Sequence, residues 1–368
     1  MRVGLDATPL LGKRSGVGRY VAGLISHLPD ADPELELALL AISFRRGMLP
    51  EVETPRVRWV RRRVPARAAH EIWQRLDCPP VEMLTGRLTL FHGTNFLAPP
   101  ARAATVITVH DLTCTRYPEQ CTPWTRRYAS LVPDMARRAA AVLTPSAFVA
   151  EEVKDWLSLP DDRVVATPLG VDPSLFEVSP PAPRRLRELG VEGGYLLFAG
   201  TLEPRKNLSG LIAAYRLLPG LLGQAPPALV LTGAAGWGAD PLEGQAHLPG
   251  PVVRTGFVSD AELAELYAGA SCFCFPSLYE GFGLPPLEAM AAGTPVVAST
   301  GGSLPEILGD AALLVPATET EALAEAIARV LTDGALAARL RGAGRERARQ
   351  FTWQACAKRT AEVYRQVA

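Results

Sequence analysis

Short apolar runs alternate along the chain with longer stretches in which apolar residues recur every three or four positions. The first run, Arg2–Asp6, predicts a buried strand, and residues 17–28 follow it with the apolar spacing of a helix. The alternation continues to the C-terminus and predicts an α/β fold with parallel, doubly wound sheets. Further strands are expected at 35–42, 88–92, 104–109, 141–144 and 164–167, and helices at 125–138 and 146–157.

A proline-rich break at residues 172–183 interrupts this alternation and is typical of an interdomain linker. A second α/β series begins after it, and the chain ends in two helical segments that separate near residues 351–353. A length of 368 residues is enough for two domains, each with its own core. We expect Rossmann-like domains at 1–175 and 184–350, facing each other across a cleft, and a final helix at 351–368. The second series predicts strands at 195–200, 228–232, 252–255, 272–275, 295–298 and 313–315, and helices at 207–218, 260–268, 284–291 and 320–331.

Composition excludes several classes of protein. The 38 basic and 38 acidic residues cancel, which argues against a chain built mainly to bind nucleic acid. A hydrophobic content of 48% excludes wholesale disorder. The longest uncharged run, 217–239, is broken by proline and glycine, and the first residues lack the apolar core of a signal peptide. These features favour a cytoplasmic protein.

Seven arginines are concentrated between Arg56 and Arg75, interleaved with Trp59, Ile72 and Trp73. One interpretation is a patch that contacts an anionic membrane or a lipid-phosphate acceptor. The other is a solvated strand, loop and helix whose tryptophans fill the core. We favour the second, because a run of charge is weak evidence for a binding surface.

The most informative segment is 277–299, SLYEGFGLPPLEAMAAGTPVVAS. Glu280 precedes a glycine-rich loop, and Glu288 comes after seven intervening residues, on the helix that the prolines begin. Loop amides and a helix N-terminus bind anions, and a carboxylate can accept hydrogen bonds from sugar hydroxyls. The segment therefore suits a molecule with a sugar, a diphosphate and a ribose. The alternative, that Glu288 only caps or solvates its helix, would be preferred for an isolated pair of glutamates.

Two adjacent cations, Arg205 and Lys206, lie in the segment 198–208, FAGTLEPRKNL, where a strand ends and a helix begins. Ligands of parallel sheets bind beyond the carboxyl ends of strands, and two cations there could neutralise a departing diphosphate. A solvated, exposed helix start is the alternative. Cations at a helix N-terminus oppose the helix dipole, so a bound anion would explain the placement.

Three weaker signals also follow strands. Residues 15–19, SGVGR, form a glycine-rich turn into a helix that could present amides to a phosphate or sugar, but the spacing is not that of a dinucleotide site. His110 and Asp111 follow one strand, and Asn95 follows another. Each could face substrate or be structural, and strand-end placement leaves both possibilities open.

In combination these motifs resemble those of the retaining glycosyltransferases of family 4, which have the GT-B fold, and the string GTLEPRKNL with HDL and GVGRY is most similar to their bacterial mannosyltransferase-like branch. The resemblance spans nearly the whole chain. It implies a donor side in the second domain, an acceptor side in the first, and a final helix that crosses back to the first domain. It implies catalytic roles for Glu280, Arg205, Lys206 and His110, donor binding by Glu288, Gly16, Gly18, Phe282, Gly283, Leu284 and Gly200, and acceptor-side positions at Asn95 and Asp111.

The resemblance further implies transfer of a hexose, with mannose favoured, from a nucleotide-diphospho-sugar to a glycan or lipid-linked acceptor. GDP-mannose is the favoured donor, with UDP- or ADP-sugars as alternatives, and neither cofactor nor metal is expected. Peripheral attachment to the inner face of a membrane stays open. Two other functions are a UDP-sugar epimerase, which would lack this glutamate pair and PRKN segment, and a catalytically silent partner, against which the intact charged residues argue.

Overall fold

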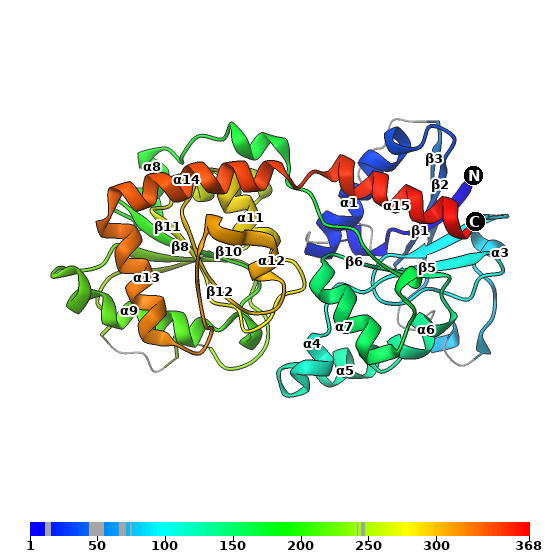
Figure 1. The fold of residues 1–368 in the computed structure, drawn as a ribbon, viewed down its shortest axis with the longest axis horizontal. Coiled ribbons are helices and arrows are strands. Elements are labelled where there is room, and N and C mark those ends of the chain that lie inside the picture. The colour runs from blue at the N-terminus through cyan, green and yellow to red at the C-terminus, as the bar shows by residue number, and fades with distance from the viewer. Residues whose placement is uncertain (12–15, 44–54, 66–70, 74–75, 241, 244–246) are drawn as a thin grey trace. The chain divides into compact units, whose positions relative to one another are not determined.

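Two parallel sheets, one in each unit of the chain, organise the computed structural model (Figure 1). The structure describes residues 1–11, 16–43, 55–65, 71–73, 76–240, 242–243 and 247–368. Unit 1 comprises Met1–Gly170 and Thr352–Ala368, and unit 2 comprises Val171–Phe351.

The boundary between the units falls after Gly170, earlier than residue 175, where the sequence placed it. The predicted linker at 172–183 belongs to unit 2 and is partly ordered as helix. The backbone N–H of Val171 bonds to the carbonyl of Phe351 at 3.1 Å, and Leu175 is buried in this unit. The apolar side chain of Leu175 therefore draws the proline-rich segment onto unit 2.

The sheet of unit 1 has seven strands in the order β3-β2-β1-β4-β5-β6-β7, and all of its pairings are parallel. Strand β1 is central and fully apolar in its middle, and its Leu5 pairs with Leu39 on one side and His92 on the other. Continuous apolar runs are typical of parallel strands that are covered on both faces. The strands are β1 Arg2–Asp6, β2 Glu36–Ile42, β3 Val57–Arg62, β4 Leu90–Gly93, β5 Ala104–Thr108, β6 Ala141–Thr144 and β7 Val164–Ala166.

Helices connect these strands, and most match the predicted ranges. The exception is the single helix predicted at 125–138, which is two helices, α5 and α6. Pro133 lies in the first turn of α6, where its missing N–H costs no hydrogen bond, and the chain turns at Ser130 and Leu131. The described helices of unit 1 are α1 Gly16–Ala31, α3 Glu82–Thr85, α4 Thr113–Arg116, α5 Pro123–Ala129, α6 Val132–Arg138, α7 Ala147–Leu157 and α15 Trp353–Val367.

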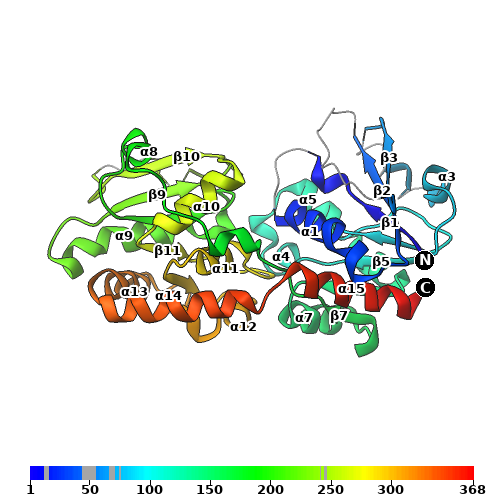
Figure 2. The same cartoon turned by 90° about the horizontal axis from the view of Figure 1, so that it is seen from above.

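The last helix, α15, packs against α1, the first helix of the chain (Figures 1 and 2). Trp353 and Tyr364 on α15 are buried, and Arg365 pairs with the buried Asp32 carboxylate at 3.0 Å. The Thr352 side chain accepts a hydrogen bond from the N–H of Ala355 and so caps the helix. Burial of an apolar face explains why the chain returns to unit 1 at its end.

Unit 2 has a six-stranded parallel sheet in the order β10-β9-β8-β11-β12-β13. Helix α9 packs against α13, and α11 packs against α10, α12 and α14. The strands are β8 Tyr195–Ala199, β9 Ala228–Thr232, β10 Val252–Gly256, β11 Cys272–Phe275, β12 Val296–Ser299 and β13 Leu313–Val315. The helices are α8 Pro183–Glu188, α9 Leu208–Leu222, α10 Asp260–Gly269, α11 Leu284–Ala291, α12 Leu304–Leu308, α13 Thr320–Thr332 and α14 Gly334–Arg349.

The arginine-rich segment is largely structural where the structure describes it. Arg58 donates to the carbonyl of Thr85 at 2.6 Å, Arg62 donates to that of Leu84 at 3.1 Å, and Arg56 binds the carbonyls of Pro29 and Pro33. Trp73 is buried in the core of unit 1, which supports the second interpretation of this segment. Arg61 and Arg63 are exposed, whereas Arg67 and Arg75 lie outside the described residues.

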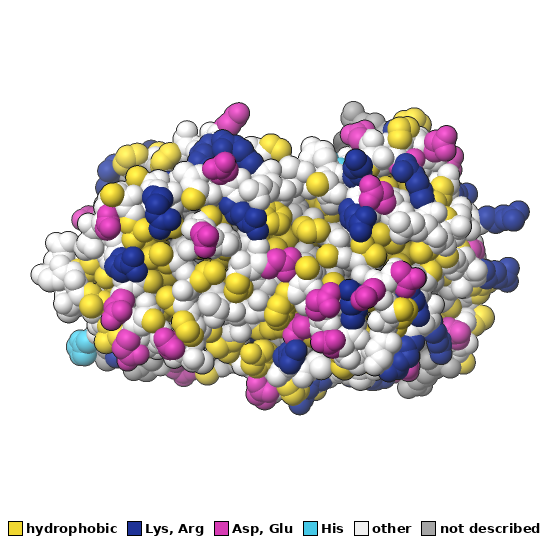
Figure 3. All heavy atoms as spheres, in the orientation of Figure 1, with side chains coloured by type: hydrophobic (Ala, Val, Ile, Leu, Met, Phe, Trp, Pro, Cys, Tyr) yellow, Lys and Arg dark blue, Asp and Glu magenta, His cyan; other side chains and the backbone are white. Residues whose placement is uncertain are grey.

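Charges of both signs are interspersed on the face of the described chain drawn in Figure 3, without a large basic field. Within the described residues, no helix is both long and apolar enough to cross a bilayer.

Candidate active site

Four charged side chains form a buried cluster beyond the carboxyl ends of β8 and β11 in unit 2. Lys206 Nζ lies 2.6 Å from Glu280 Oε1, and Arg205 Nη1 lies 2.9 Å from Glu280 Oε2. The Arg205 guanidinium also binds Glu203 Oε1 at 2.8 Å. The structure thus brings together three of the predicted catalytic residues, which come from two separate loops.

Backbone contacts hold these two loops together. Arg205 and Lys206 lie on a single 3-10 turn, Pro204–Lys206, rather than on the first turn of the following helix. The N–H of Leu278 donates to the carbonyl of Arg205, and the Arg205 guanidinium donates to the carbonyl of Tyr279, both at 2.8 Å. The two segments therefore fix the cations and Glu280 in one geometry.

Two glycines shape the loop around Glu280. Gly302 has φ +65°, and a Cβ there would come within 2.3 Å of the Glu280 carbonyl oxygen. This carbonyl instead accepts hydrogen bonds from the N–H and hydroxyl of Ser303. Gly283, at φ +92°, begins α11 in a conformation that side chains disfavour.

Burial and the neighbouring charges shift the pKa values of Glu280 and Lys206. Burial by itself raises the pKa of Glu280, but the charges of Arg205 and Lys206 outweigh it and lower that pKa to about 2. Burial is the largest influence on Lys206 and lowers its pKa; the Arg205 charge lowers it further, against the opposing effect of the two glutamates. Lys206 also lies over the Phe275 ring, 5.0 Å from its centroid.

The alternative that Lys206 lies at a solvated, exposed helix start is wrong. Lys206 is only 7% exposed, and the negative charges of Glu280 and Glu203 already balance the charges of the two cations. The placement of two cations before a helix therefore needs no external anion to offset it, because the folded chain supplies two carboxylates. What the arrangement offers is a preformed pair of cations whose partners are fixed before any ligand arrives.

Glu288 lies on the second turn of α11. It is close to Glu280 in the sequence, but its side chain forms a hydrogen bond outside the charged cluster. Glu288 is 7% exposed, and the hydroxyl of Tyr267 on α10 donates to its Oε2 at 3.2 Å. No side chain caps the N-terminus of α11, where the N–H groups of Phe282, Gly283 and Leu284 lie. Glu288 is therefore oriented by Tyr267 and is not the cap of its own helix.

In unit 1, His110 lies beyond the carboxyl end of β5 and is half-buried. Its Nε2 lies 2.8 Å from the carbonyl oxygen of Thr94. Because a carbonyl only accepts, Nε2 carries the proton and Nδ1 is the acceptor of the neutral ring. Burial lowers the pKa of His110, and the Thr94 contact and Asp111 raise it only in part, so the neutral form is favoured.

The other predicted positions in unit 1 have mainly local contacts. Asp111 accepts from the N–H of Thr113 at 2.9 Å, just before α4, and the carbonyl of Asn95 accepts from the hydroxyl of Tyr128. Gly16 is exposed at the first position of α1, where a Cβ would meet nothing within 4 Å, and Gly18 is buried. Ser15 and Gly12 lie outside the described residues.

Two predicted donor-binding positions in unit 2 adjoin the cluster. Gly200 follows β8, and a Cβ there would lie 3.7 Å from Lys206 Cε. Phe282 is buried, with its ring against that of Phe351.

Two residues of the site were not singled out from the sequence. Glu203 lies within the segment FAGTLEPRKNL, and its position between a strand end and two cations was the available signal. Tyr267 is on α10, and nothing in its local sequence indicates that its hydroxyl meets a carboxylate 21 residues later.

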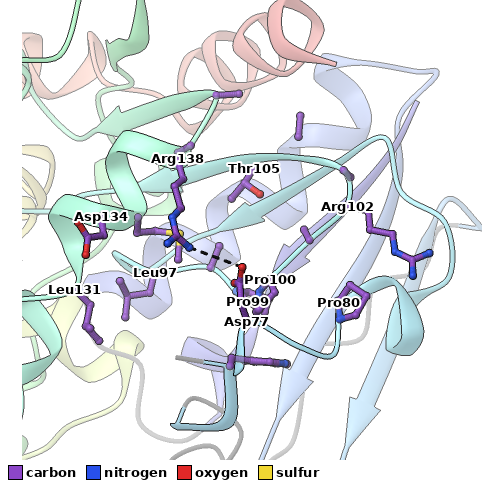
Figure 4. Close-up of a pocket in the computed structure, with 18 residues that line it drawn as sticks. Asp77, Pro80, Leu97, Pro99, Pro100, Arg102, Thr105, Leu131, Asp134 and Arg138 are labelled. Carbon is purple, nitrogen blue, oxygen red and sulfur yellow. Dashed lines mark ion pairs between the residues drawn. The ribbon is translucent and has the colours of Figure 1, made fainter. Parts of the chain in front are cut away.

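A cavity of about 860 Å³ in unit 1 contains none of the predicted site residues. Figure 4 shows Leu97, Pro99 and Pro100 on its wall and the Asp77–Arg138 ion pair across it. It borders the start of β5 and the end of α6, away from the carboxyl ends of the strands. It is therefore a separate feature from the charged cluster.

Metal-binding chemistry is not evident at the charged cluster. The described residues contain no group of three or more histidine, cysteine, aspartate or glutamate side chains that could hold a metal ion.

Comparison with known proteins identifies the family. Residues 14–175 match the model of Glycosyltransferase Family 4, and residues 187–347 match that of Glycosyl transferases group 1. The O-antigen chain mannosyltransferase B of Escherichia coli is 32% identical over 388 residues, covering 99% of this chain and all of that protein.

Solved structures show the same fold at low sequence identity. A sucrose-phosphate synthase from Thermosynechococcus elongatus covers 99% of this chain and 98% of its own at a TM-score of 0.76 and 22% identity. The structure of Anabaena HepE in complex with UDP and glucose aligns over the full length of both chains, at a TM-score of 0.69 and 19% sequence identity. The family models, the full-length relative and the two parallel sheets together show that this chain belongs to glycosyltransferase family 4 and has the GT-B fold.

Proposed function

We propose that this glycosyltransferase moves mannose from GDP-mannose to a glycan or lipid-linked acceptor, with retention of anomeric configuration and without a metal ion. The observation that carries the proposal is the pair of the partly exposed Arg205 and the buried Lys206, fixed by Glu280 and Glu203 beyond the strand ends. The mannose assignment is supported by the full-length similarity to an O-antigen chain mannosyltransferase.

The charged cluster suits the departure of a diphosphate. When the bond between the sugar C1 and the phosphate oxygen breaks, its electron pair stays on the diphosphate. Fixed cations in a water-poor site stabilise that developing charge more effectively than solvent does. Arg205 and Lys206 would supply these charges in place of a divalent cation, and the uncapped start of α11 would add backbone N–H groups.

The remaining residues would position the donor. Glu280 lies within contact of both cations and would hold the sugar against the diphosphate. Glu288, buried and oriented by Tyr267, would accept hydrogen bonds from the ribose hydroxyls. His110, with Nδ1 as its acceptor, would receive a hydrogen bond from a sugar hydroxyl, with Asn95 and Asp111 on the acceptor side.

Thermal denaturation with GDP, UDP, ADP and their sugars, with and without EDTA, tests the donor. A ligand at 100 times its Kd stabilises the folded state by about 2.7 kcal/mol, which raises the melting temperature. We expect a shift with GDP and GDP-mannose that EDTA does not change. A shift with UDP or ADP compounds alone would overturn GDP-mannose as the donor. The absence of any shift would favour a silent partner.

Replacing Glu288 by glutamine is expected to weaken GDP binding by about 1–3 kcal/mol, roughly 5- to 150-fold, because a charged acceptor for the ribose hydroxyls is lost. The glutamine oxygen can still accept from the Tyr267 hydroxyl, so packing is preserved. Isothermal titration calorimetry measures the effect. Glu265→Gln, an exposed change on the neighbouring α10, is the control. Equal affinities of Glu288→Gln and wild type would exclude the ribose contact.

The less favoured interpretation of the arginine-rich segment, peripheral contact with an anionic membrane, would act through the exposed Arg61 and Arg63. An arginine near an anionic bilayer contributes about 1 kcal/mol, so reversing both to glutamate should weaken vesicle binding at least about 30-fold. Sedimentation with vesicles containing phosphatidylserine measures this. Reversing the exposed Arg339 and Arg341 on α14 is the matched control. If both double variants bind as wild type does, the segment has no membrane role.

A further inference from the structure

A buried chain of hydrogen bonds in unit 1 connects the last helix to the neighbourhood of His110. The Tyr364 hydroxyl on α15 lies 2.6 Å from His92 Nδ1, and His92 Nε2 lies 2.7 Å from the hydroxyl of Thr108. That hydroxyl lies 2.9 Å from the hydroxyl of Tyr20 on α1. All four side chains are at most 1% exposed. None of these four residues has a role in the proposed function.

The protonation states determine which group donates and which accepts in each of these hydrogen bonds. Burial lowers the pKa of His92 to about 3, helped by the nearby His110, so its ring is neutral. Burial raises the pKa values of Tyr20 and Tyr364 far above neutral, so both hydroxyls keep their protons. A neutral imidazole donates from one nitrogen and accepts at the other. Within the described residues, the Tyr364 proton has His92 Nδ1 as its acceptor, so Nε2–H donates to Thr108.

Tyr20, at the other end of this series of hydrogen bonds, contacts His110 directly. The Tyr20 ring meets the His110 ring edge-to-face, with centroids 5.2 Å apart and an interplanar angle of 82°. Phe96 contacts the same imidazole at 5.6 Å and 75°. These two rings and the Thr94 carbonyl set the orientation of His110. Phe96 has no hydroxyl, whereas the Tyr20 ring is held by the buried hydrogen bond to Thr108.

We propose that Tyr364 and His92 are positioning residues, which hold Tyr20 through Thr108 and thereby fix the orientation of the His110 imidazole. The inference rests on the proposed function, in which His110 contacts the donor sugar. It assigns the last helix of the chain a part in site geometry as well as in packing. A misplacement of a contacting group by about 1 Å can cost about 100-fold in rate.

Tyr364→Phe and Tyr20→Phe test this inference, because each keeps the ring and removes the hydroxyl. The control is Tyr195→Phe in unit 2, which also loses a buried hydroxyl bond, that to the carbonyl of Leu266 at 2.7 Å. The chain has five histidines, so the ring nitrogens of His110 can be assigned by ¹⁵N NMR with a His110→Gln reference. We expect one tautomer in wild type and control, and a mixture in the two variants.

Transfer kinetics provide the second readout. Both phenylalanine variants should lower kcat at least about 10-fold, with GDP affinity unchanged. In a His110→Ala background, Tyr364→Phe should change kcat less than about twofold, since the residue it positions is gone. A kcat loss that persists in that background, or an unchanged His110 spectrum, would overturn the inference. If wild type shows no transfer at all, the proposed function fails, and the spectrum still decides the positioning role.

Discussion

Lys206→Ala is expected to lower the rate of mannosyl transfer by about 100- to 1000-fold, equivalent to about 3–4 kcal/mol of transition-state stabilisation. The lysine ammonium is buried, fixed at 2.6 Å from Glu280, and one of two cations beyond the strand ends. In the proposed function, its removal leaves Arg205 alone to stabilise the departing diphosphate. Single-turnover measurement of GDP release from GDP-mannose gives the rate.

The design of this experiment follows from the burial of Lys206. Lys206→Ala removes an ion pair and creates a cavity, so Lys206→Met, which keeps the aliphatic volume, should be measured beside it. Lys154→Ala is the matched control, because Lys154 also pairs with two carboxylates but lies on α7 of unit 1. A transfer rate of Lys206→Met within threefold of wild type would exclude the diphosphate role.

The second large effect concerns stability. Glu280→Gln is expected to lower the free energy of unfolding of unit 2 by about 3–5 kcal/mol, because removal of a shared counter-ion leaves buried cations uncompensated. Glu203 still faces Arg205, but Lys206 loses its 2.6 Å partner. Chemical denaturation, followed by tryptophan fluorescence and circular dichroism, measures the loss. The exposed Glu188→Gln, which also removes a partner of arginine, should change stability by less than about 1 kcal/mol.

This stability difference should depend on pH in a defined direction. The pKa of Glu280 is about 2 in the folded protein, below its ordinary value of 4.5. A lowered pKa stabilises the fold at pH values above 4.5, and the contribution of about 3 kcal/mol is lost as pH falls from 4.5 towards 2. The gap between wild type and Glu280→Gln should therefore narrow over that range. A gap that is the same at pH 7 and pH 2.5 would show that Glu280 is not the ionised partner.

Much of the architecture was predictable from local sequence. Buried parallel strands are continuous apolar runs, so β1, β6, β9 and β11 fall where the runs are. The single helix predicted at 125–138 was wrong because apolar spacing alone does not locate the break at Ser130 and Leu131. The glycine-rich loop after Glu280 was also predictable, since Gly283 and the following prolines mark a helix start.

The charges of the site were identifiable from the sequence, but their pairing was not. Glu280 and Lys206 are 74 residues apart, and no local pattern indicates that their side chains meet or that both are buried. The sequence suggested that the two cations required an external anion, whereas the fold provides Glu203 and Glu280. Burial and long-range pairing depend on which strands become neighbours, and this is a property of the sheet order.

The hydrogen-bond chain behind His110 shows the same division most clearly. The sequence by itself determined the type and order of most elements, the division into two α/β series and the family to which the motifs point, because these follow from periodicity and local turn chemistry. Only the tertiary structure decided that Tyr364 reaches His92, 272 residues earlier, and that Tyr20 contacts His110. Such contacts arise when α15 packs against α1, and packing between distant segments leaves no local signature in either of them.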